Sequence, residues 1–540
     1  MYKLKLSLAL LALMVSFGLT AQTLQDGKKF HHQQRYQSAR ESMTKALAAA
    51  PTNPELIYWL AQVHFDMKDV NGAKEVLKKG MEGANGSNPL LLVAMGQAEL
   101  VEKKSNDARQ RFETAISLTK GKDIAVYAAI GKANLEEGGD AAYGIEKLKA
   151  ATLIKNFKDP MVHVYMGDLY RKLNDGGGAV SSYENALLID PKLAVAKYKI
   201  GKIYLTQGSE QREIFLGKFK DAVTDDQTFT PALYDLYVYY FSRDVNEATK
   251  YFGLYKAHTD PGPALDYEEA SLQFAAGDFK NAITKADALL QTQGANADAR
   301  LYRLKGYCFD KLGDSIQALS LLETFFQKAQ PDQVNPDNYV VAAYSAAKQK
   351  AEPAKIEYYF TKSIETDTAV SNKIDYARKA ADFFKKSGNT VKSAEWLTKI
   401  LSINPKLSKV DLYNAGFENF KASQFQTADS IFSIYKTQFA NEVYGHYWSF
   451  RSRSVIDSTM EQGLAIPDCE KFISVAELDK AKNKSTLITA YGYLAGYSAN
   501  IKKDLAAAKS YLEKIIEIDP TNQDAIKNRD IIDKALAAKK

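Results

Sequence analysis

The sequence predicts an all-α solenoid built from helix–turn–helix repeats, and two observations lead to that prediction. A small residue is followed twelve positions later by an alanine, and four positions after that by a large apolar residue, many times along the chain. The alanines of neighbouring repeats lie 34 or 35 residues apart. In a chain of 540 residues, of which 46% are hydrophobic, such a period indicates stacked repeats that share one continuous core.

The twelve-residue spacing runs through most of the chain. Two antiparallel helices approach closely only where one side chain is small, so each pair marks a contact between the two helices of a repeat. Residues 22–521 offer room for about 14 repeats of 34 residues. The pairs are Gly27 and Ala39, Ala61 and Ala73, Gly96 and Ala108, Gly167 and Ala179, Ala270 and Ala282, Gly306 and Ala318, Gly416 and Ala428, and Gly496 and Ala508.

This pattern closely resembles the tetratricopeptide repeat family. The best single match is MGDLYRKLNDGGGAVSSYENALLIDP, from Met166 to Pro191, which carries the family's glycine, tyrosine, alanine and proline positions. The resemblance implies a right-handed superhelix in which the first helix of each repeat lines a concave groove. A targeting segment precedes the repeats, so we expect a member of the family of the exported bacterial type.

That segment, residues 1–21, is expected to be a secretory signal peptide. Lys3 and Lys5 precede an apolar run from Leu6 to Phe17, and Ala21 marks the expected cleavage site. An uncleaved anchor helix is the alternative. We expect an exported chain, either free in the periplasm or held at the outer or inner membrane by a partner. No later segment is apolar enough to predict a transmembrane helix.

The repeats are expected to form two arrays, over residues 22–260 and 264–521. The Pro-Gly-Pro triplet at 261–263 disfavours helix and predicts a bend between the arrays. Residues 451–484 depart from the pattern and are expected to be an irregular insertion. Residues 522–540 are expected to be a polar capping helix, which repeat arrays need for solubility.

Composition and motifs point away from several functions. Lys and Arg number 71 against 65 Asp and Glu, so the basic excess typical of nucleic-acid binding is missing. The sequence contains no HExxH, GxSxG or GxxxxGK[ST] motif, so we predict no catalytic residue, no metal and no cofactor. His31 and His32 are adjacent and are expected at a solvated helix end. Cys308 and Cys469 are 161 residues apart and are expected to be buried free thiols.

Aromatic residues give the one positive indication of a binding site. Positions three before, one after and four after the small residue share a helix face, which the resemblance places in the groove. Tyrosine suits peptide recognition because it combines a rigid contact area with a hydroxyl group. Packing between repeats is the alternative role for these side chains. The predicted partner-binding residues are Tyr58, Tyr198, Tyr267, Tyr307, Tyr413, Phe417, Tyr493 and Tyr497.

We therefore expect a non-catalytic scaffold of the bacterial cell envelope. Its partners would be other envelope proteins or peptides, bound in a tyrosine-rich concave groove. A glycan-binding helical-repeat protein of the outer membrane is the main alternative, because aromatic rings also stack on sugars. An enzyme whose site is hosted by the insertion at 451–484 is a second alternative.

Overall fold

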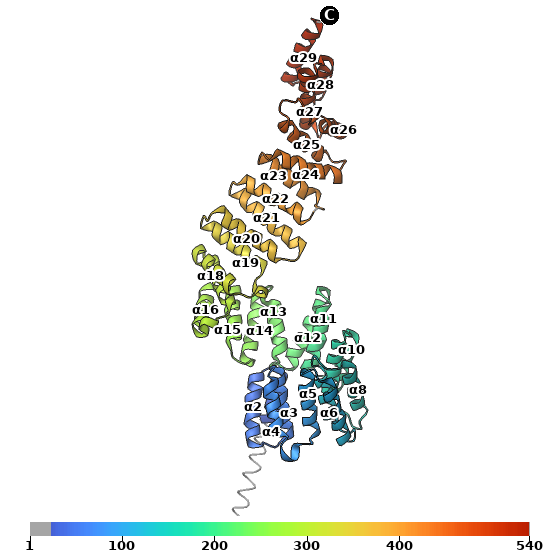
Figure 1. Ribbon diagram of the computed structural model, residues 1–540, viewed down its shortest axis with the longest axis vertical. Helices are drawn as coiled ribbons and strands as arrows, with labels where there is room; N and C mark the ends of the chain where they lie inside the picture. The colour runs from blue at the N-terminus through green and yellow to red at the C-terminus, as the bar shows by residue number, and fades with distance from the viewer. Residues whose placement is uncertain (1–22, 405, 539–540) are drawn as a thin grey trace, which may run out of the picture. The chain divides into compact units, whose positions relative to one another are not determined.

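The computed structural model describes residues 23–404 and 406–538, and the predicted signal peptide lies outside these residues. The described residues are mostly helical, without β-strand, and form a solenoid of antiparallel helix pairs (Figure 1). The chain divides into two compact units, unit 1 from Met1 to Ala297 and unit 2 from Asp298 to Lys540. The division falls one helix pair after the Pro-Gly-Pro triplet, and a bend at the triplet remains a prediction.

Unit 1 begins with a helical segment over residues 23–32, which pairs with the first labelled helix. The other helices follow in pairs along the chain. They are α2 (Tyr36–Ala49), α3 (Pro54–Asp66), α4 (Val70–Gly80), α5 (Pro89–Val101), α6 (Ser105–Leu118), α7 (Ile124–Ala133), α8 (Ala141–Thr152), α9 (Pro160–Lys172), α10 (Gly176–Ile189), α11 (Ala194–Thr206), α12 (Arg212–Asp225), α13 (Thr230–Phe241), α14 (Val245–His258), α15 (Pro263–Ala275) and α16 (Phe279–Gln293).

Unit 2 continues the same arrangement. Its helices are α17 (Ala299–Leu312), α18 (Ser315–Lys328), α19 (Pro336–Lys348), α20 (Pro353–Thr366), α21 (Val370–Lys386), α22 (Thr390–Ile403), α23 (Lys409–Lys421), α24 (Phe425–Gln438), α25 (Val443–Ile456), α26 (Ile466–Ala476), α27 (Lys484–Tyr497), α28 (Leu505–Ile518) and α29 (Gln523–Ala537). Short 3-10 helices occur at η1 (Gly83–Asn85), η2 (Ser209–Gln211), η3 (Gly294–Asn296), η4 (Pro331–Gln333) and η5 (Glu477–Asp479), and a π-helical segment at η6 (Ser498–Lys502).

The described residues form fourteen such pairs, eight in unit 1 and six in unit 2, followed by α29. Much of the predicted irregular insertion at 451–484 is helical, because it contains the end of α25 and all of α26. In the part of the chain that the structure describes, no helix combines the length and apolar character needed to cross a membrane.

The small-residue positions hold the two helices of each pair together, as predicted. Ala39, Ala108, Ala179 and Ala428 are completely buried. A Cβ atom added to Gly167 would lie 2.4 Å from Cε1 of Tyr183, sixteen residues later, so the ring packs directly on the glycine backbone. This is the large apolar position that the sequence pattern assigns to the second helix.

Two repeats depart from this geometry. Gly131 packs on Leu148, seventeen residues later, because the small positions Gly131 and Gly144 lie thirteen residues apart instead of twelve. The prediction for Gly496 was wrong: its nearest neighbour outside its own helix is Met460, at 4.0 Å from an added Cβ, and it does not contact Leu512. The π-helical segment η6 follows the glycine and changes the register of this repeat.

Unit 1 contains a long-range contact between its first and seventh helix pairs (Figure 1). Arg35 occupies the N-cap position of α2 but makes no side-chain capping bond. Instead, Asp260 accepts hydrogen bonds from the backbone N–H groups of Gln37, at 2.8 Å, and Ser38, at 3.3 Å. The hydroxyl of Ser38 also donates to Asp260, and Arg35 lies 3.7 Å from the carboxylate.

Candidate functional site

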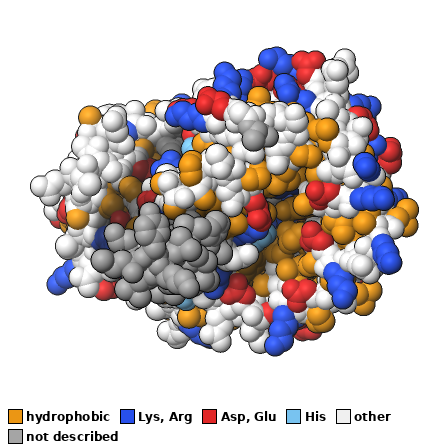
Figure 2. All heavy atoms as spheres, turned by 90° about the horizontal axis from the view of Figure 1, so that it is seen from below, with side chains coloured by type: hydrophobic (Ala, Val, Ile, Leu, Met, Phe, Trp, Pro, Cys, Tyr) orange, Lys and Arg blue, Asp and Glu red, His pale blue; other side chains and the backbone are white. Residues whose placement is uncertain are grey.

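The first helices of five neighbouring pairs in unit 1 form a pocket of about 550 Å³, called here the unit 1 pocket. Figure 2 shows hydrophobic side chains around a hollow in the surface seen from below, with charged groups near its edge. The helices α3, α5, α7 and α9 supply residues from the N-terminal part of each helix, and Lys28 and His32 come from the C-terminal half of the segment 23–32. The lining is Lys28 and His32; Pro54, Glu55, Tyr58 and Trp59 of α3; Asn88, Pro89 and Leu90 at the start of α5; Asp123, Ala125, Ala128 and Ala129 around α7; and Asp159, Met161 and Tyr165 around α9.

The lining follows a repeat rule that differs from the predicted one. The residue six before the small position lines the pocket in four of the five pairs, as Glu55, Leu90, Ala125 and Met161. Positions two and three before it also contribute; of the predicted positions after it, only Lys28, one after Gly27, lines the pocket. The pocket therefore lies nearer the helix N-termini than we expected, and of the eight predicted residues only Tyr58 lines it.

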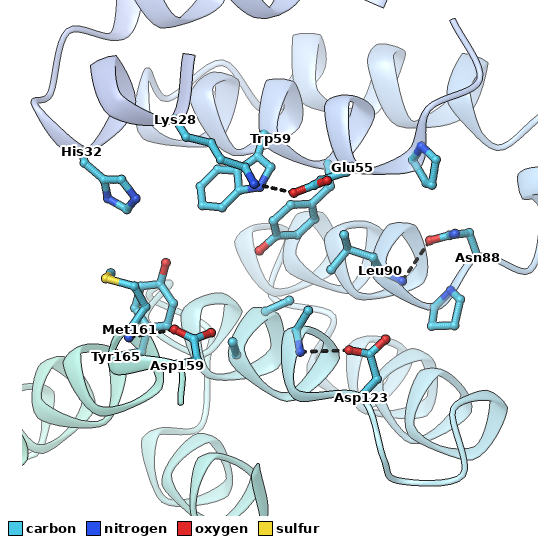
Figure 3. A pocket seen from close by; sticks show the side chains of 16 residues that line it. Lys28, His32, Glu55, Trp59, Asn88, Leu90, Asp123, Asp159, Met161 and Tyr165 are labelled. Carbon is cyan, nitrogen blue, oxygen red and sulfur yellow. Dashed lines mark hydrogen bonds and ion pairs between the residues drawn. The ribbon is translucent and has the colours of Figure 1, made fainter. Parts of the chain in front are cut away.

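On one wall of the unit 1 pocket, Trp59 contacts Lys28 and Tyr58. Lys28 lies over its ring at 5.4 Å from the centroid and forms an ion pair with Glu55. Tyr58 packs edge-on against Trp59, with ring centroids 5.5 Å apart. In Figure 3 Trp59, Lys28 and Glu55 come from the upper helices, while Asp123 and Asp159 lie below the open space.

The two adjacent histidines are not at a solvated helix end, so that prediction was wrong. His31 is buried, and its Nε2 lies 2.6 Å from Asp66, which also pairs with Lys132 at 3.2 Å. Burial lowers the pKa of His32 to about 3, assisted by the charges of His31 and Lys132, so His32 is neutral near pH 7. Burial opposes ionisation of Asp66, but Lys132 and His31 hold its pKa well below the usual range.

Two aspartates face the unit 1 pocket from helix N-cap positions. Asp123 accepts from the N–H of Ala125 at 2.9 Å, and Asp159 accepts from the N–H of Met161 at 2.9 Å. Burial raises the pKa of the Asp159 carboxyl, although the hydrogen bond from Met161 opposes this effect. Such a shift indicates a carboxylate whose charge is incompletely compensated by its surroundings.

Of the other two predicted aromatic residues of unit 1, Tyr198 contacts neighbouring helices. Tyr198 is half-buried, and its hydroxyl donates to Asp235 of the next pair at 3.0 Å. Its ring lies 5.4 Å from that of Phe219. Tyr267 is half-buried on α15. Tyr198 therefore links successive repeats, which is the packing role considered as the alternative.

In unit 2 the structure brings Tyr413 and Phe417 together. Their rings stack with centroids 5.7 Å apart, and Trp448 of α25 lies 4.8 Å from Phe417. The remaining three predicted residues, all half-buried, contact other parts of unit 2. Tyr307 accepts a hydrogen bond from Asn338, Tyr493 packs edge-on against Phe450, and Tyr497 lies close to Gly463.

A buried polar network connects α24, α25 and α26 and includes Arg453 and Asp468 of the segment 451–484, which was considered as a possible enzyme site. Asp468 pairs with Lys436 at 2.6 Å and with Arg453 at 2.8 Å. Burial alone would raise the pKa of Asp468, but His446, Lys436 and Arg453 lower it to about 2. These charges compensate one another, and the network holds three helices together.

Both cysteines are buried free thiols, as predicted. Burial raises the pKa of the Cys308 thiol to about 12 and also raises that of Cys469. Within residues 23–404 and 406–538, no group of three or more His, Cys, Asp or Glu side chains is arranged to hold a metal ion.

Comparison with known proteins adds family information to this geometry. Two segments, residues 30–95 and residues 493–522, match models described as tetratricopeptide repeat. No curated protein matches the sequence. The first matched segment contains α2, α3 and α4, and therefore the wall of the unit 1 pocket that carries Tyr58 and Trp59.

Solved structures that resemble this chain include several described as TPR proteins. The C-terminal part of a TPR repeat-containing protein from Cytophaga hutchinsonii is 24% identical over 48% of this chain and 98% of that chain, with a TM-score of 0.30. A thermophilic TPR protein from Thermus thermophilus is 17% identical over 44% of this chain and 98% of that chain, with a TM-score of 0.25. Cut9–Hcn1, the APC/C hetero-tetramer, is 14% identical over 94% of this chain and 95% of that chain, with a TM-score of 0.26.

Proposed function

We propose that the chain is a non-catalytic scaffold that receives a partner segment in the unit 1 pocket. It is a tetratricopeptide repeat protein, and proteins of this kind bind other proteins. The observation that carries the proposal is the pocket itself, about 550 Å³ in volume and lined from five neighbouring helix pairs. Its aromatic and apolar residues, with a few polar groups among them, suit recognition of side chains. Of the predicted groove residues, Tyr58 contributes to this site, and Tyr413 with Phe417 offers a second contact surface in unit 2.

The proposal includes export to the bacterial cell envelope, with envelope proteins or peptides as partners. It rests on the composition of residues 1–21, which has the layout of a secretory signal peptide. Cell fractionation followed by N-terminal sequencing of the chain tests it. A periplasmic chain that begins at Gln22 is the expected result, and a chain retained in the cytoplasm with Met1 in place would contradict it.

Site-specific photo-cross-linking in cells that express the chain tests the scaffold role. A benzoylphenylalanine placed at Leu90, inside the unit 1 pocket, should capture a small and reproducible set of proteins. The matched control is the same probe at Lys149, an exposed residue on the second helix of a neighbouring pair. Capture of the same proteins from both positions, or no capture from Leu90, would contradict the proposal.

A further inference from the structure

The charges that line the unit 1 pocket are unbalanced. One lysine stands against three carboxylates, and His32 is neutral, so the lining carries a net charge of 1 − 3 = −2. Lys28 is already paired with Glu55. The excess negative charge therefore belongs to Asp123 and Asp159, on the opposite wall (Figure 3).

Both aspartates use one oxygen for the helix they cap, which leaves acceptor capacity for a ligand. For Asp123 and for Asp159 the capping bonds involve Oδ1. An ionised carboxylate can accept several hydrogen bonds through its two oxygens. The helix N-termini carry partial positive charge, but the N–H groups of Ala125 and Met161 already donate to these caps. The groups presented to a ligand are consequently oxygen acceptors.

The rest of the lining suits the long apolar stem of a basic side chain. Met161, Leu90 and the ring of Tyr165 lie between the carboxylates and the aromatic wall. Arginine and lysine bury their methylene groups along apolar surfaces and place the cation at a polar group. Trp59 already has Lys28 over its ring at 5.4 Å, which shows that this surface accommodates a cation.

We propose that the unit 1 pocket recognises a basic segment of its partner, with an arginine or lysine side chain inserted toward Asp123 and Asp159. This inference rests on the proposed scaffold function and specifies the chemistry of the partner. A guanidinium group fits best, because it donates two parallel hydrogen bonds to a carboxylate. Burial of Asp159 favours the same ligand. The surroundings compensate the negative charge of this carboxylate only in part, and a bound cation would compensate the rest.

A pair of peptides tests the inference. The probe is a fluorescein-labelled peptide with two arginines separated by two alanines, and its partner carries citrulline, a neutral analogue, at both positions. Fluorescence anisotropy with the full chain should show binding of the arginine peptide at least about tenfold tighter than that of the citrulline peptide. An Asp123→Asn, Asp159→Asn double variant should lose most of this difference. Asparagine caps a helix as well as aspartate does, so the variant keeps both helix N-termini.

Asp175→Asn is the matched control, because Asp175 caps α10 in the same unit and does not line the pocket. This variant should retain the preference for arginine. Equal affinity for the two peptides, the absence of binding, or an arginine preference that survives in the double variant would overturn the inference. If the probe at Leu90 still captures partners in that case, the scaffold function stands and only the assigned chemistry fails.

Discussion

Asp260 caps a helix that begins more than 220 residues before it, and removing its carboxylate should loosen that helix. Replacement of an N-cap side chain by alanine costs about 1 kcal/mol, within a range of about 0.5–2 kcal/mol. Asp260 accepts from two backbone N–H groups and one hydroxyl, and its side chain is only 19% exposed. We therefore expect Asp260→Ala to cost about 1.5 kcal/mol, near the upper part of that range, at the start of α2.

Hydrogen exchange measured by mass spectrometry reports this effect locally. A loss of about 1.4 kcal/mol in the free energy of opening corresponds to about tenfold faster exchange, so peptides covering residues 36–49 should exchange about tenfold faster in Asp260→Ala. Asp260→Asn should keep most of the protection, because asparagine is an equivalent cap.

Asp244→Ala provides the control, since Asp244 caps α14 through the N–H groups of Asn246 and Glu247. Exchange should rise in α14 and not in α2. The reasoning would be refuted if α2 exchanged at the wild-type rate in Asp260→Ala, or if the two alanine variants affected α2 equally.

Three further predictions follow from packing and charge. Gly167→Ala should destabilise unit 1 by about 1–3 kcal/mol in urea denaturation, because the added Cβ collides with the buried ring of Tyr183. The control is Gly253→Ala, where an added Cβ has no heavy atom within 4 Å; it should be neutral or stabilising by up to about 1 kcal/mol. Because the pKa of Asp468 is lowered to about 2, its ionised form stabilises unit 2 above about pH 4, and about 2 kcal/mol of stability should disappear as the pH falls toward 2. In Asp468→Asn that part of the acid loss should be missing from a pH series of thermal melts, and an unchanged profile would contradict the assignment. A thiol reagent at pH 8 should label neither cysteine in the native chain and both in denaturant; rapid native labelling would show that the thiols are accessible.

The helix pairs were predictable because their determinants are close together in the sequence. The glycine and the large residue that packs on it, such as Gly167 and Tyr183, lie sixteen positions apart in a fixed register. The extra residue between Gly131 and Gly144 moves Gly131 onto Leu148 without breaking the contact, so the pattern tolerates small changes in the turns.

The site was less predictable, for a geometric reason. Residues three before and one after the small position share a helix face, but they lie at different depths along the first helix, and the sequence does not indicate at which depth the helices form a pocket. Trp59 and Tyr165 both occupy the position two before it, on the edge of that face, and were missed. The neutral His32 was also missed, because its burial depends on side chains supplied by other helices.

The bond between Asp260 and α2 also bears on how such an array can change in evolution. In an open array each repeat meets only its neighbours, so a repeat can be gained or lost with small consequences for the rest. The bond between the first and seventh helix pairs removes this freedom from the repeats between them, because an inserted or deleted repeat would carry Asp260 away from Gln37 and Ser38. We expect the number of repeats between α2 and α14 to be constant among relatives, and variation in repeat number to occur after α14.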